Sequence, residues 1–219
     1  MPEVTAASFD RMPYRHGAVQ ETHPARIGAI ARLLGWGAAA PDCCRVLDLG
    51  CGEGMNVLPL AERLPGSEFV GVDFSPAHIA VAERAREAAG LKNARLVCAD
   101  LRDYEPARGA FDYVIAHGVY CWVSPEVRER LLDLIASALA PQGVAYISYN
   151  TYPAWGLFGG LRAMLRAELA TVADPVARLA QLLPVLERAS AAMHGPYATL
   201  LHEVLAEWRT RPPELIFHD

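Results

Sequence analysis

The sequence predicts a protein of the α/β class with a doubly wound, mostly parallel sheet, and three observations support this prediction. Apolar strand-like segments alternate with helical segments between residues 45 and 150. The strand-like segments are apolar almost without interruption, as in strands that helices cover on both faces. The first of them runs directly into three alternate glycines, Gly50, Gly52 and Gly54. A glycine-rich loop after the first strand is typical of ligand-binding sheets of this kind.

The elements of this sheet can be assigned in order along the chain. A helix is expected over residues 22–36, where Thr22 can cap it and Pro24 fits the first turn because no intrahelical donor is lost there. Strands are expected at residues 45–49, 68–73, 94–100, 111–118 and 144–150. Helices are expected at 54–64, where Pro59 should bend the helix or lie in an early turn, at 77–90 after Ser75-Pro76, and at 126–139 after Ser124-Pro125.

After Pro153 the pattern changes to helices alone. Residues 156–173, 174–193 and 197–209 have helical apolar spacing, and no further strand is expected. We therefore expect an N-terminal lid segment and helix at residues 1–40, an α/β core at 41–152 and a C-terminal helical extension at 153–219. The apolar helices of the extension could cover the core, form a homodimer or contact a further domain.

Composition narrows the classes of partner. Hydrophobic residues make up 53% of the 219 residues, which is enough for a buried core. The net charge is −5, Lys92 is the only lysine and no basic block exists, so a nucleic-acid partner is not expected. No apolar run approaches the roughly 20 residues of a spanning helix, and the first residues lack the order of a signal peptide. We therefore expect no membrane partner and a cytoplasmic location.

The five cysteines are Cys43, Cys44, Cys51, Cys98 and Cys121. Their number is odd and no two of them form a C-x-x-C pair, so the spacings typical of metal sites are absent. We expect reduced cysteines that act as small hydrophobic residues, and no bound metal.

The glycine loop indicates the chemistry of the ligand. In an open α/β sheet, ligands bind beyond the carboxyl ends of the strands, and glycine leaves no Cβ to obstruct them. The dinucleotide fingerprint G-x-G-x-x-G would need a glycine where Met55 stands. Asp48, two residues before Gly50, suits a cationic group better than a pyrophosphate. The loop therefore predicts a small, flat or extended ligand that carries a positive charge.

The pattern D-x-G-x-G-x-G that begins at Asp48 resembles the first motif of the class I S-adenosylmethionine (SAM)-dependent methyltransferases. Three further segments resemble later motifs of that class in the same order, namely "VGVD" ending at Asp73, "CADLRD" around Asp100 and "FDYVIAHG" ending at Gly118. The resemblance implies a Rossmann-like methyltransferase fold, SAM as the cofactor and S-adenosylhomocysteine as the product.

The resemblance also assigns cofactor contacts. An acidic residue at Asp73 can accept both ribose hydroxyls, and it lies at the expected distance along the chain from the loop. Asp100 and the backbone at Leu101 would contact the adenine edge. Tyr14, together with His16 and His23, could cover the cofactor. The expected cofactor-binding residues are Tyr14, Asp48, Gly50, Cys51, Gly52, Asn56, Asp73, Phe74, Asp100, Leu101 and His117.

Two more particular segments, "HGVYCWVSPEVRERLL" and "SYNTYPAW", resemble a bacterial family that joins a methyltransferase domain to a methyltransferase regulatory domain. That family includes protein-lysine methyltransferases, so the resemblance implies a lysine amine as one methyl acceptor. Members typically run on past the point at which this sequence stops, into the regulatory domain. A small-molecule N- or O-methyltransferase, or a non-catalytic SAM-binding regulatory module, are the alternatives.

The expected catalytic residues follow the fourth and fifth strands, and they are His117, Tyr120, Asn150 and Tyr152. Histidine titrates near neutrality and can accept a proton. Aromatic faces attract cations such as a sulfonium or a lysine ammonium by roughly 0.5–2 kcal/mol. Asn150 and Tyr152 could orient the nucleophile. Trp155 is expected to pack against the following helix.

Overall fold

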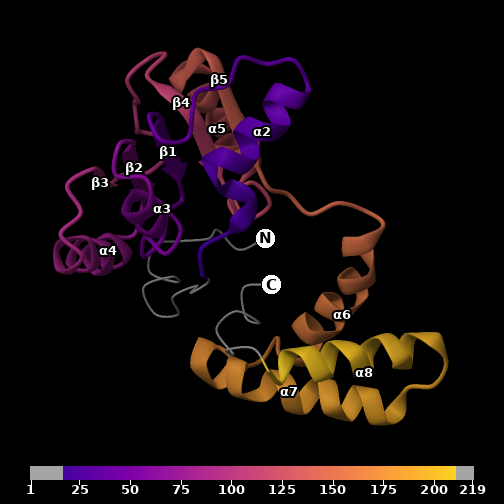
Figure 1. Cartoon of the computed structure of the whole chain (residues 1–219). Coiled ribbons are helices and arrows are strands. Elements are labelled where there is room, and N and C mark those ends of the chain that lie inside the picture. The colour runs from indigo at the N-terminus through magenta and orange to yellow at the C-terminus, as the bar shows by residue number, and fades with distance from the viewer. Residues whose placement is uncertain (1–16, 211–219) are drawn as a thin grey trace. The chain divides into compact units, whose positions relative to one another are not determined.

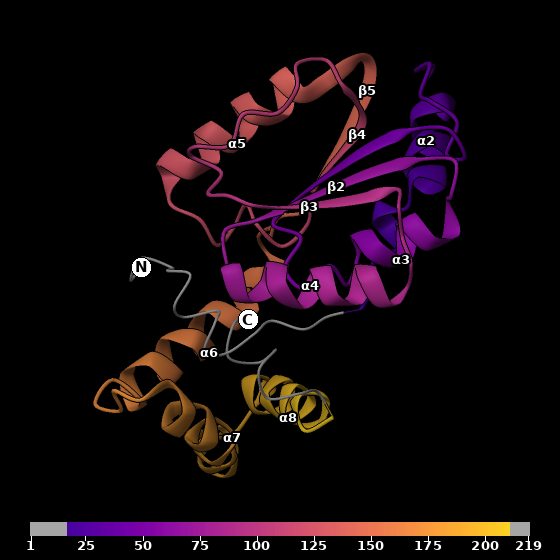
Figure 2. The same ribbon diagram turned by 90° about the vertical axis from the view of Figure 1, so that its left-hand side faces the viewer.

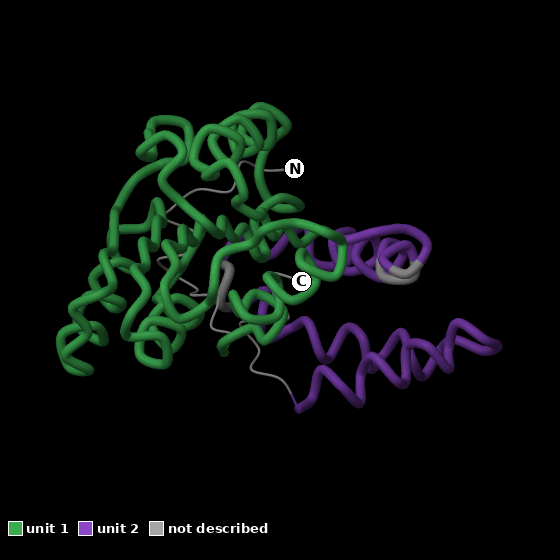
Figure 3. Tube along the Cα trace, turned by 45° about the horizontal axis from the view of Figure 1, so that its top comes forward, with its two compact units in different colours: residues 1–149 green, residues 150–219 purple. Residues whose placement is uncertain are grey.

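The computed structural model describes residues 17–210 and divides the chain into two compact units, residues 1–149 and 150–219 (Figure 3). Tyr14 and His16 lie outside the described residues, so their expected role as a cover over the cofactor stays a prediction. Each unit has a hydrophobic core of its own.

The first unit contains five parallel strands in the order β3-β2-β1-β4-β5 (Figure 1). Their bounds are Arg45–Leu49 for β1, Glu68–Asp73 for β2, Ala94–Cys98 for β3, Phe111–Ala116 for β4 and Leu139–Ile147 for β5. The predicted doubly wound parallel sheet is confirmed. Because β1 pairs with β2 on one side and with β4 on the other, the winding direction reverses beside β1, and ligands bind at such switch points.

Helices cover both faces of this sheet (Figure 2). They are η1 (Gln20–Thr22), α2 (Pro24–Leu33), α3 (Val57–Arg63), α4 (Pro76–Ala88) and α5 (Pro125–Ala138). Successive strand residues point to opposite faces. Val46 accordingly packs in the core formed with α2, α3 and α4, and Leu47 packs in the core formed with α5. Asp48, one position further, is directed toward the α3 side, where Asn56 contacts it.

The predicted helix starts at Ser75 and Ser124 are confirmed. The Ser75 Oγ atom accepts a hydrogen bond of 3.1 Å from the His78 amide, and the Ser124 Oγ atom accepts one of 3.4 Å from the Val127 amide. Pro59 is the third residue of α3, so it lies in an early turn and removes no intrahelical hydrogen bond.

The start of α2 differs from the prediction. His23 is the N-cap, and its Nδ1 atom accepts a hydrogen bond of 3.1 Å from the Ala25 amide. Thr22 does not cap the helix because its hydroxyl contacts the Asn56 side chain instead. The structure thus gives His23 a capping role, and its expected role as part of a cover over the cofactor stays a prediction.

Strand β5 begins five residues earlier than predicted. Leu139 pairs with Phe111, and the next pair is Tyr113 with Val144, so the residues between form an irregularity in the ladder. The turn-forming residues of the sequence "PQG" therefore lie inside β5 rather than before it.

The cysteines are free, as predicted, but they are not all buried. Cys44 and Cys51 are buried and act as small apolar residues, whereas Cys43 and Cys98 are exposed. Cys98 is exposed because it ends β3, the edge strand of the sheet. Within residues 17–210, no cluster of three or more His, Cys, Asp or Glu residues is placed to hold a metal ion.

The second unit consists of α6 (Ala154–Glu168), α7 (Pro175–Ala192) and α8 (Pro196–Trp208), as the predicted helical extension requires. The Asp174 Oδ2 atom caps α7 by accepting a hydrogen bond of 2.9 Å from the Ala177 amide. The core of the second unit is formed by the buried residues Leu161, Leu165, Leu169, Leu182, Val185, Leu186, Leu201, Val204, Leu205 and Trp208. Among the described helices of both units, none has the length and apolar character needed to cross a bilayer.

Candidate functional site

The glycine loop leaves the carboxyl end of β1 and turns toward β2. The backbone amides of Gly50 and Cys51 both donate to the Val72 carbonyl, at 2.8 and 3.0 Å. Gly50, Gly52 and Gly54 have φ angles of +76°, +54° and +78°, a region that other L-residues adopt only with strain. The glycines are therefore required by the backbone path of the loop.

The three glycines differ in what lies beside them. A Cβ atom at Gly50 would collide with the Val119 side chain, and one at Gly54 would lie 2.9 Å from Leu58 and 3.1 Å from Ala82. A Cβ atom at Gly52 would have no atom of residues 17–210 within 4 Å. Gly50 and Gly54 thus allow close packing within the protein, whereas Gly52 borders open space that a ligand can occupy.

Asp48 lies two residues before the first glycine of this loop. It is 3% exposed, and its Oδ2 atom lies 3.3 Å from the Asn56 Nδ2 atom, which donates to it. Burial raises the pKa of Asp48 to about 7, with a further contribution from the nearby Asp73, while the hydrogen bond from Asn56 opposes the rise. A cation bound beside Asp48 would favour the ionised carboxylate, so the site suits a positively charged ligand group.

Cys51 is buried in the middle of the loop. Burial, together with the charges of Asp48 and Asp73, raises the pKa of its thiol well above the usual value. A Cβ atom at Gly71 would lie 2.9 Å from the Cys51 Sγ atom, so glycine at that position of β2 makes room for the thiol. The Cys51 side chain is therefore a neutral packing group, and a cofactor contact would come from its backbone.

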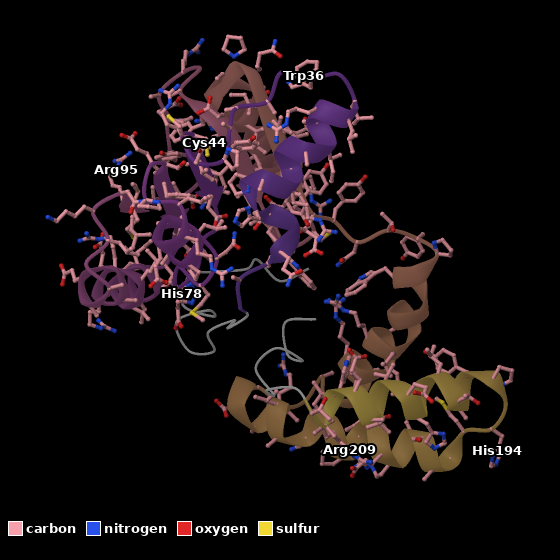
Figure 4. All side chains as sticks on the ribbon, in the orientation of Figure 1. Trp36, Cys44, His78, Arg95, His194 and Arg209 are labelled. Atoms are coloured by element: carbon pink, nitrogen blue, oxygen red, sulfur yellow. The ribbon has the colours of Figure 1, made fainter. Side chains whose placement is uncertain are left out.

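Asp73 ends β2 and is 7% exposed. Its Oδ2 atom accepts a hydrogen bond of 2.9 Å from the Gly52 amide, and its Oδ1 atom accepts one of 3.0 Å from the Ser75 amide. The Nδ1 atom of His78 lies 3.4 Å from Oδ1. His78 belongs to the first turn of α4 (Figure 4). Sequence reasoning did not identify His78, although its position three residues after the cap residue Ser75 was visible in the sequence.

Asp100 follows β3 and is engaged by Arg102. The Arg102 Nη2 atom lies 2.7 Å from Asp100 Oδ2, and its Nε atom lies 3.1 Å from Oδ1. The hydrogen bonds from Arg102 hold the pKa of Asp100 below its usual value. An adenine amine would therefore have to share this carboxylate with Arg102, a neighbour that sequence reasoning did not identify. The Leu101 side chain is buried in the α5-side core, and the expected contact of its backbone with adenine stays a prediction.

His117 and Tyr120 follow β4, as predicted. The His117 ring stacks on Tyr146 of β5, with ring centroids 6.0 Å apart. The Tyr120 ring lies 6.2 Å from that of Tyr149 and 5.5 Å from the Arg128 guanidinium carbon. His117 thus contacts β5 through Tyr146, whereas Tyr120 and Tyr149 form an aromatic group beside Arg128. Tyr146 packs against the core on the α3 side of the sheet, and Tyr120 packs against the core on the α5 side. The sequence analysis did not assign Tyr146, Tyr149 or Arg128 to the site.

The remaining candidates are placed less closely. Asn150 and Tyr152 are exposed and belong to the second unit, so their position beside the β4 residues stays a prediction. Phe74 is half-buried directly after Asp73, and its expected contact with the cofactor stays a prediction. Trp122 and Trp155 are both half-buried.

The donor set at the strand ends fits SAM. Carboxylates end or follow three neighbouring strands, with Asp48 in β1, Asp73 in β2 and Asp100 after β3. They match the ammonium, the ribose hydroxyls and the exocyclic amine of that cofactor, and Gly52 leaves open space beside them. Fold and site together define a class I SAM-dependent methyltransferase.

Comparison with known proteins gives the same class. Residues 46–143 match the family model of a methyltransferase domain. The chain is 33% identical to the uncharacterized protein RP028 of Rickettsia prowazekii (strain Madrid E), over 97% of this chain and 86% of RP028. The chain therefore belongs to the class I SAM-dependent methyltransferases and to the same family as RP028.

Two further relatives bear on the methyl acceptor. PKMT2 from Rickettsia typhi, whose structure is known in complex with AdoHcy, is 30% identical in sequence to this chain. The two structures match with a TM-score of 0.80, over 94% of this chain and 40% of the PKMT2 chain. Trans-aconitate 2-methyltransferase of Variovorax paradoxus (strain S110) is 36% identical over 61% of this chain and 47% of the enzyme. The chain thus spans less than half of the PKMT2 chain.

Proposed function

We propose that this protein transfers a methyl group from SAM to the side-chain amine of a protein lysine. The observation that carries the proposal is the extent of the likeness to PKMT2, a protein-lysine methyltransferase. That likeness covers 94% of this chain and so includes helices of the second unit. The likeness to trans-aconitate 2-methyltransferase covers 61%. Helices beyond the shared fold are where methyltransferases with different acceptors are free to differ.

The bound cofactor would supply a methyl group on a positively charged sulfur. Asp48 and the glycine loop would hold its amino-acid end, and Asp73 would accept its ribose hydroxyls. The lysine nitrogen would form the new bond to the methyl carbon while the carbon–sulfur bond breaks, and the electron pair of that bond would remain on sulfur. Alignment of the two reactants can supply several kcal/mol of the barrier.

The lysine amine must first lose a proton, because its ordinary pKa is about 10.4. His117 and Tyr120, at the end of β4, are the described side chains that we assign to this step, either as acceptor or as a relay to solvent. Tyr149 is 62% exposed and lies beside Tyr120, so the aromatic group is open to a long side chain from outside. A cation over an exposed aromatic ring gains roughly 0.5–1 kcal/mol.

A small-molecule acceptor is the second candidate, and one observation favours it. The Arg128 guanidinium over the Tyr120 ring places a positive charge next to the same aromatic group. A carboxylate-bearing acceptor such as trans-aconitate would be attracted to that charge, whereas a lysine ammonium would be repelled until it loses its proton.

Incubation with isotopically labelled SAM can separate these candidates. The acceptors offered would be a library of lysine-centred peptides, the same library with arginine in place of lysine, and trans-aconitate. We expect label on the lysine nitrogen, located by fragmentation mass spectrometry, and none on the arginine library. Label on trans-aconitate alone would replace the lysine proposal with the second candidate. Binding of SAM without transfer to any of these or to the proteins of a cell extract would indicate a non-catalytic module.

A further inference from the structure

The side chain of Asn56 connects the N-terminal segment to the cofactor site. Its Oδ1 atom lies 3.2 Å from the Val19 amide nitrogen and 3.0 Å from the Thr22 Oγ1 atom. Its Nδ2 atom lies 3.3 Å from Asp48 Oδ2. Thr22, Asn56 and Asp48 are 0%, 5% and 3% exposed, so these contacts are sheltered from water.

The orientation of the Asn56 amide follows from its partners. A backbone N–H can only donate, so the Val19 amide requires the Asn56 oxygen, and the NH2 group must then face Asp48. The Thr22 hydroxyl has one proton and lies close to two acceptors, the Val19 carbonyl at 2.8 Å and Asn56 Oδ1 at 3.0 Å. When it donates to Asn56, it reinforces the orientation in which the NH2 group faces the carboxylate.

We infer that Thr22 is a positioning residue for SAM binding, because through Asn56 it holds a hydrogen-bond donor on the carboxylate of Asp48 that receives the cationic end of the cofactor. The inference rests on the placement of SAM proposed above and does not depend on the identity of the methyl acceptor. Thr22 is 26 positions from Asp48 in the sequence, and the contact depends on how residues 17–22 pack onto α3.

The electrostatic surroundings make Asp48 sensitive to this donor. Burial raises its pKa to about 7, and Asp73 on β2 adds to the rise. The Cys51 thiol is the other titratable group coupled to Asp48, and His78 on α4 lies against Asp73. The register partners of Asp48 on the neighbouring strands, Gly71 and Ile115, carry no charge. The hydrogen bond from Asn56 lowers the pKa of Asp48, so weakening it leaves more of Asp48 protonated at neutral pH.

Replacement of Thr22 by Val removes the hydroxyl and keeps the shape of the side chain. We expect the midpoint of the pH dependence of SAM affinity to move upward by about 0.5–1 pH unit. Because the wild-type midpoint is about 7, this shift corresponds to about a 2- to 5-fold weaker affinity at pH 7. At a pH well above both midpoints the affinity should return to that of the wild type, because Asp48 is then ionised in both proteins. Thr22→Ser should restore the wild-type midpoint, and Thr22→Cys, a weaker donor, should give an intermediate shift.

A matched control is Ser67→Ala. Ser67 is 1% exposed and its hydroxyl also joins two backbone groups, since it lies 2.9 Å from both the Cys44 amide and the Pro41 carbonyl. Its loss should lower the stability of the protein without moving the pH midpoint of SAM binding, because Ser67 precedes the amino end of β2, away from the carboxyl ends of the strands.

The titration of the protein without cofactor supplies a second measurement. The carboxyl 13C shift of Asp48 should report a higher pKa in Thr22→Val than in the wild type or in Ser67→Ala. Equal weakening of SAM binding at every pH, an unmoved carboxyl titration, or a Thr22→Ser variant that behaves like Thr22→Val would overturn the inference. SAM affinity is measured by calorimetric titration. A wild-type protein that binds no SAM in that titration would refute the cofactor placement itself, which separates this failure from a failure of the Thr22 inference.

Discussion

The carboxylate of Asp73 accepts a hydrogen bond from the backbone amide of Gly52, at 2.9 Å, although the two residues belong to different strand–loop segments. One carboxylate at the end of β2 thereby fixes the loop that follows β1. The same group is the expected acceptor for the ribose hydroxyls, so we expect one side chain to set both the position of the loop and the position of the ribose. Loop order and cofactor binding would then be coupled at Asp73.

Replacement of Asp73 by Asn tests this coupling. An amide keeps one acceptor oxygen, so one of the Gly52 and Ser75 amides loses its partner. We expect the free energy of unfolding to fall by about 1–3 kcal/mol and SAM affinity to fall at least about tenfold. Chemical denaturation and calorimetry measure the two effects.

The control for that variant is Asp112→Asn. The Asp112 Oδ2 atom accepts a hydrogen bond of 2.8 Å from the Arg45 amide, at the opposite end of β1 from the glycine loop. This variant should lose stability while binding SAM normally. If Asp73→Asn also bound SAM as tightly as the wild type, the ribose assignment would be wrong.

Gly52 and Gly54 offer a pair of substitutions that separate ligand contact from packing. Both have positive φ angles, so alanine at either costs roughly 1 kcal/mol in backbone strain. At Gly54 the added methyl also meets Leu58 and Ala82, whereas at Gly52 it meets open space. We expect Gly54→Ala to lower the melting temperature more, and Gly52→Ala to lose more SAM affinity per unit of stability lost, at least about tenfold. A Gly52→Ala variant that keeps full affinity would contradict the assignment of that space to the cofactor.

The raised pKa of Asp48 predicts how stability depends on pH. The folded protein holds a proton on Asp48 up to pH about 7, whereas an unfolded chain releases it near pH 3.9. The folded state therefore binds more protons between these values, and this group's contribution to stability falls as pH rises from about 4 to about 7 and stays constant above. A difference of about three pKa units corresponds to a cost of about 4 kcal/mol at pH 8.

Asp48→Asn removes this cost while keeping an oxygen that can accept from Asn56. We expect the cofactor-free variant to be more stable than the wild type at pH 8, by about 1–4 kcal/mol, and to lose that advantage at pH 5. SAM affinity should fall by at least about tenfold, because a neutral amide replaces the carboxylate that receives the cation. Urea denaturation at the two pH values, with and without SAM, checks both parts. An advantage of the same size at pH 5 and pH 8 would show that Asp48 does not titrate in this range.

Local sequence patterns were sufficient for the order of the strands and for the acidic strand ends, although they placed the start of β5 five residues too late. Alternation of strands and helices determines the order of the elements, and a carboxylate that directly follows a strand must lie at its carboxyl end. The partners of those carboxylates were not predictable in the same way. Arg102 beside Asp100 looked like any exposed arginine, and Thr22 looked like a helix cap until packing placed it on Asn56. These contacts depend on tertiary structure, which short-range spacing does not encode.

The catalytic assignment of Tyr120 can be tested by removing a single hydroxyl. Tyr120→Phe keeps the ring beside Tyr149 and Arg128, so packing should be preserved. If the hydroxyl relays the proton of the acceptor, kcat should fall by about 100-fold or more while the Kd for SAM changes less than about threefold. His117→Ala should act in the same direction if the imidazole takes the proton. Tyr113→Phe is the matched control, because the Tyr113 hydroxyl donates to the Ala39 carbonyl at 2.6 Å and its loss should reduce stability without changing kcat. Unchanged turnover in both Tyr120→Phe and His117→Ala would assign proton removal to solvent, and the residues after β4 would then serve only to position the acceptor.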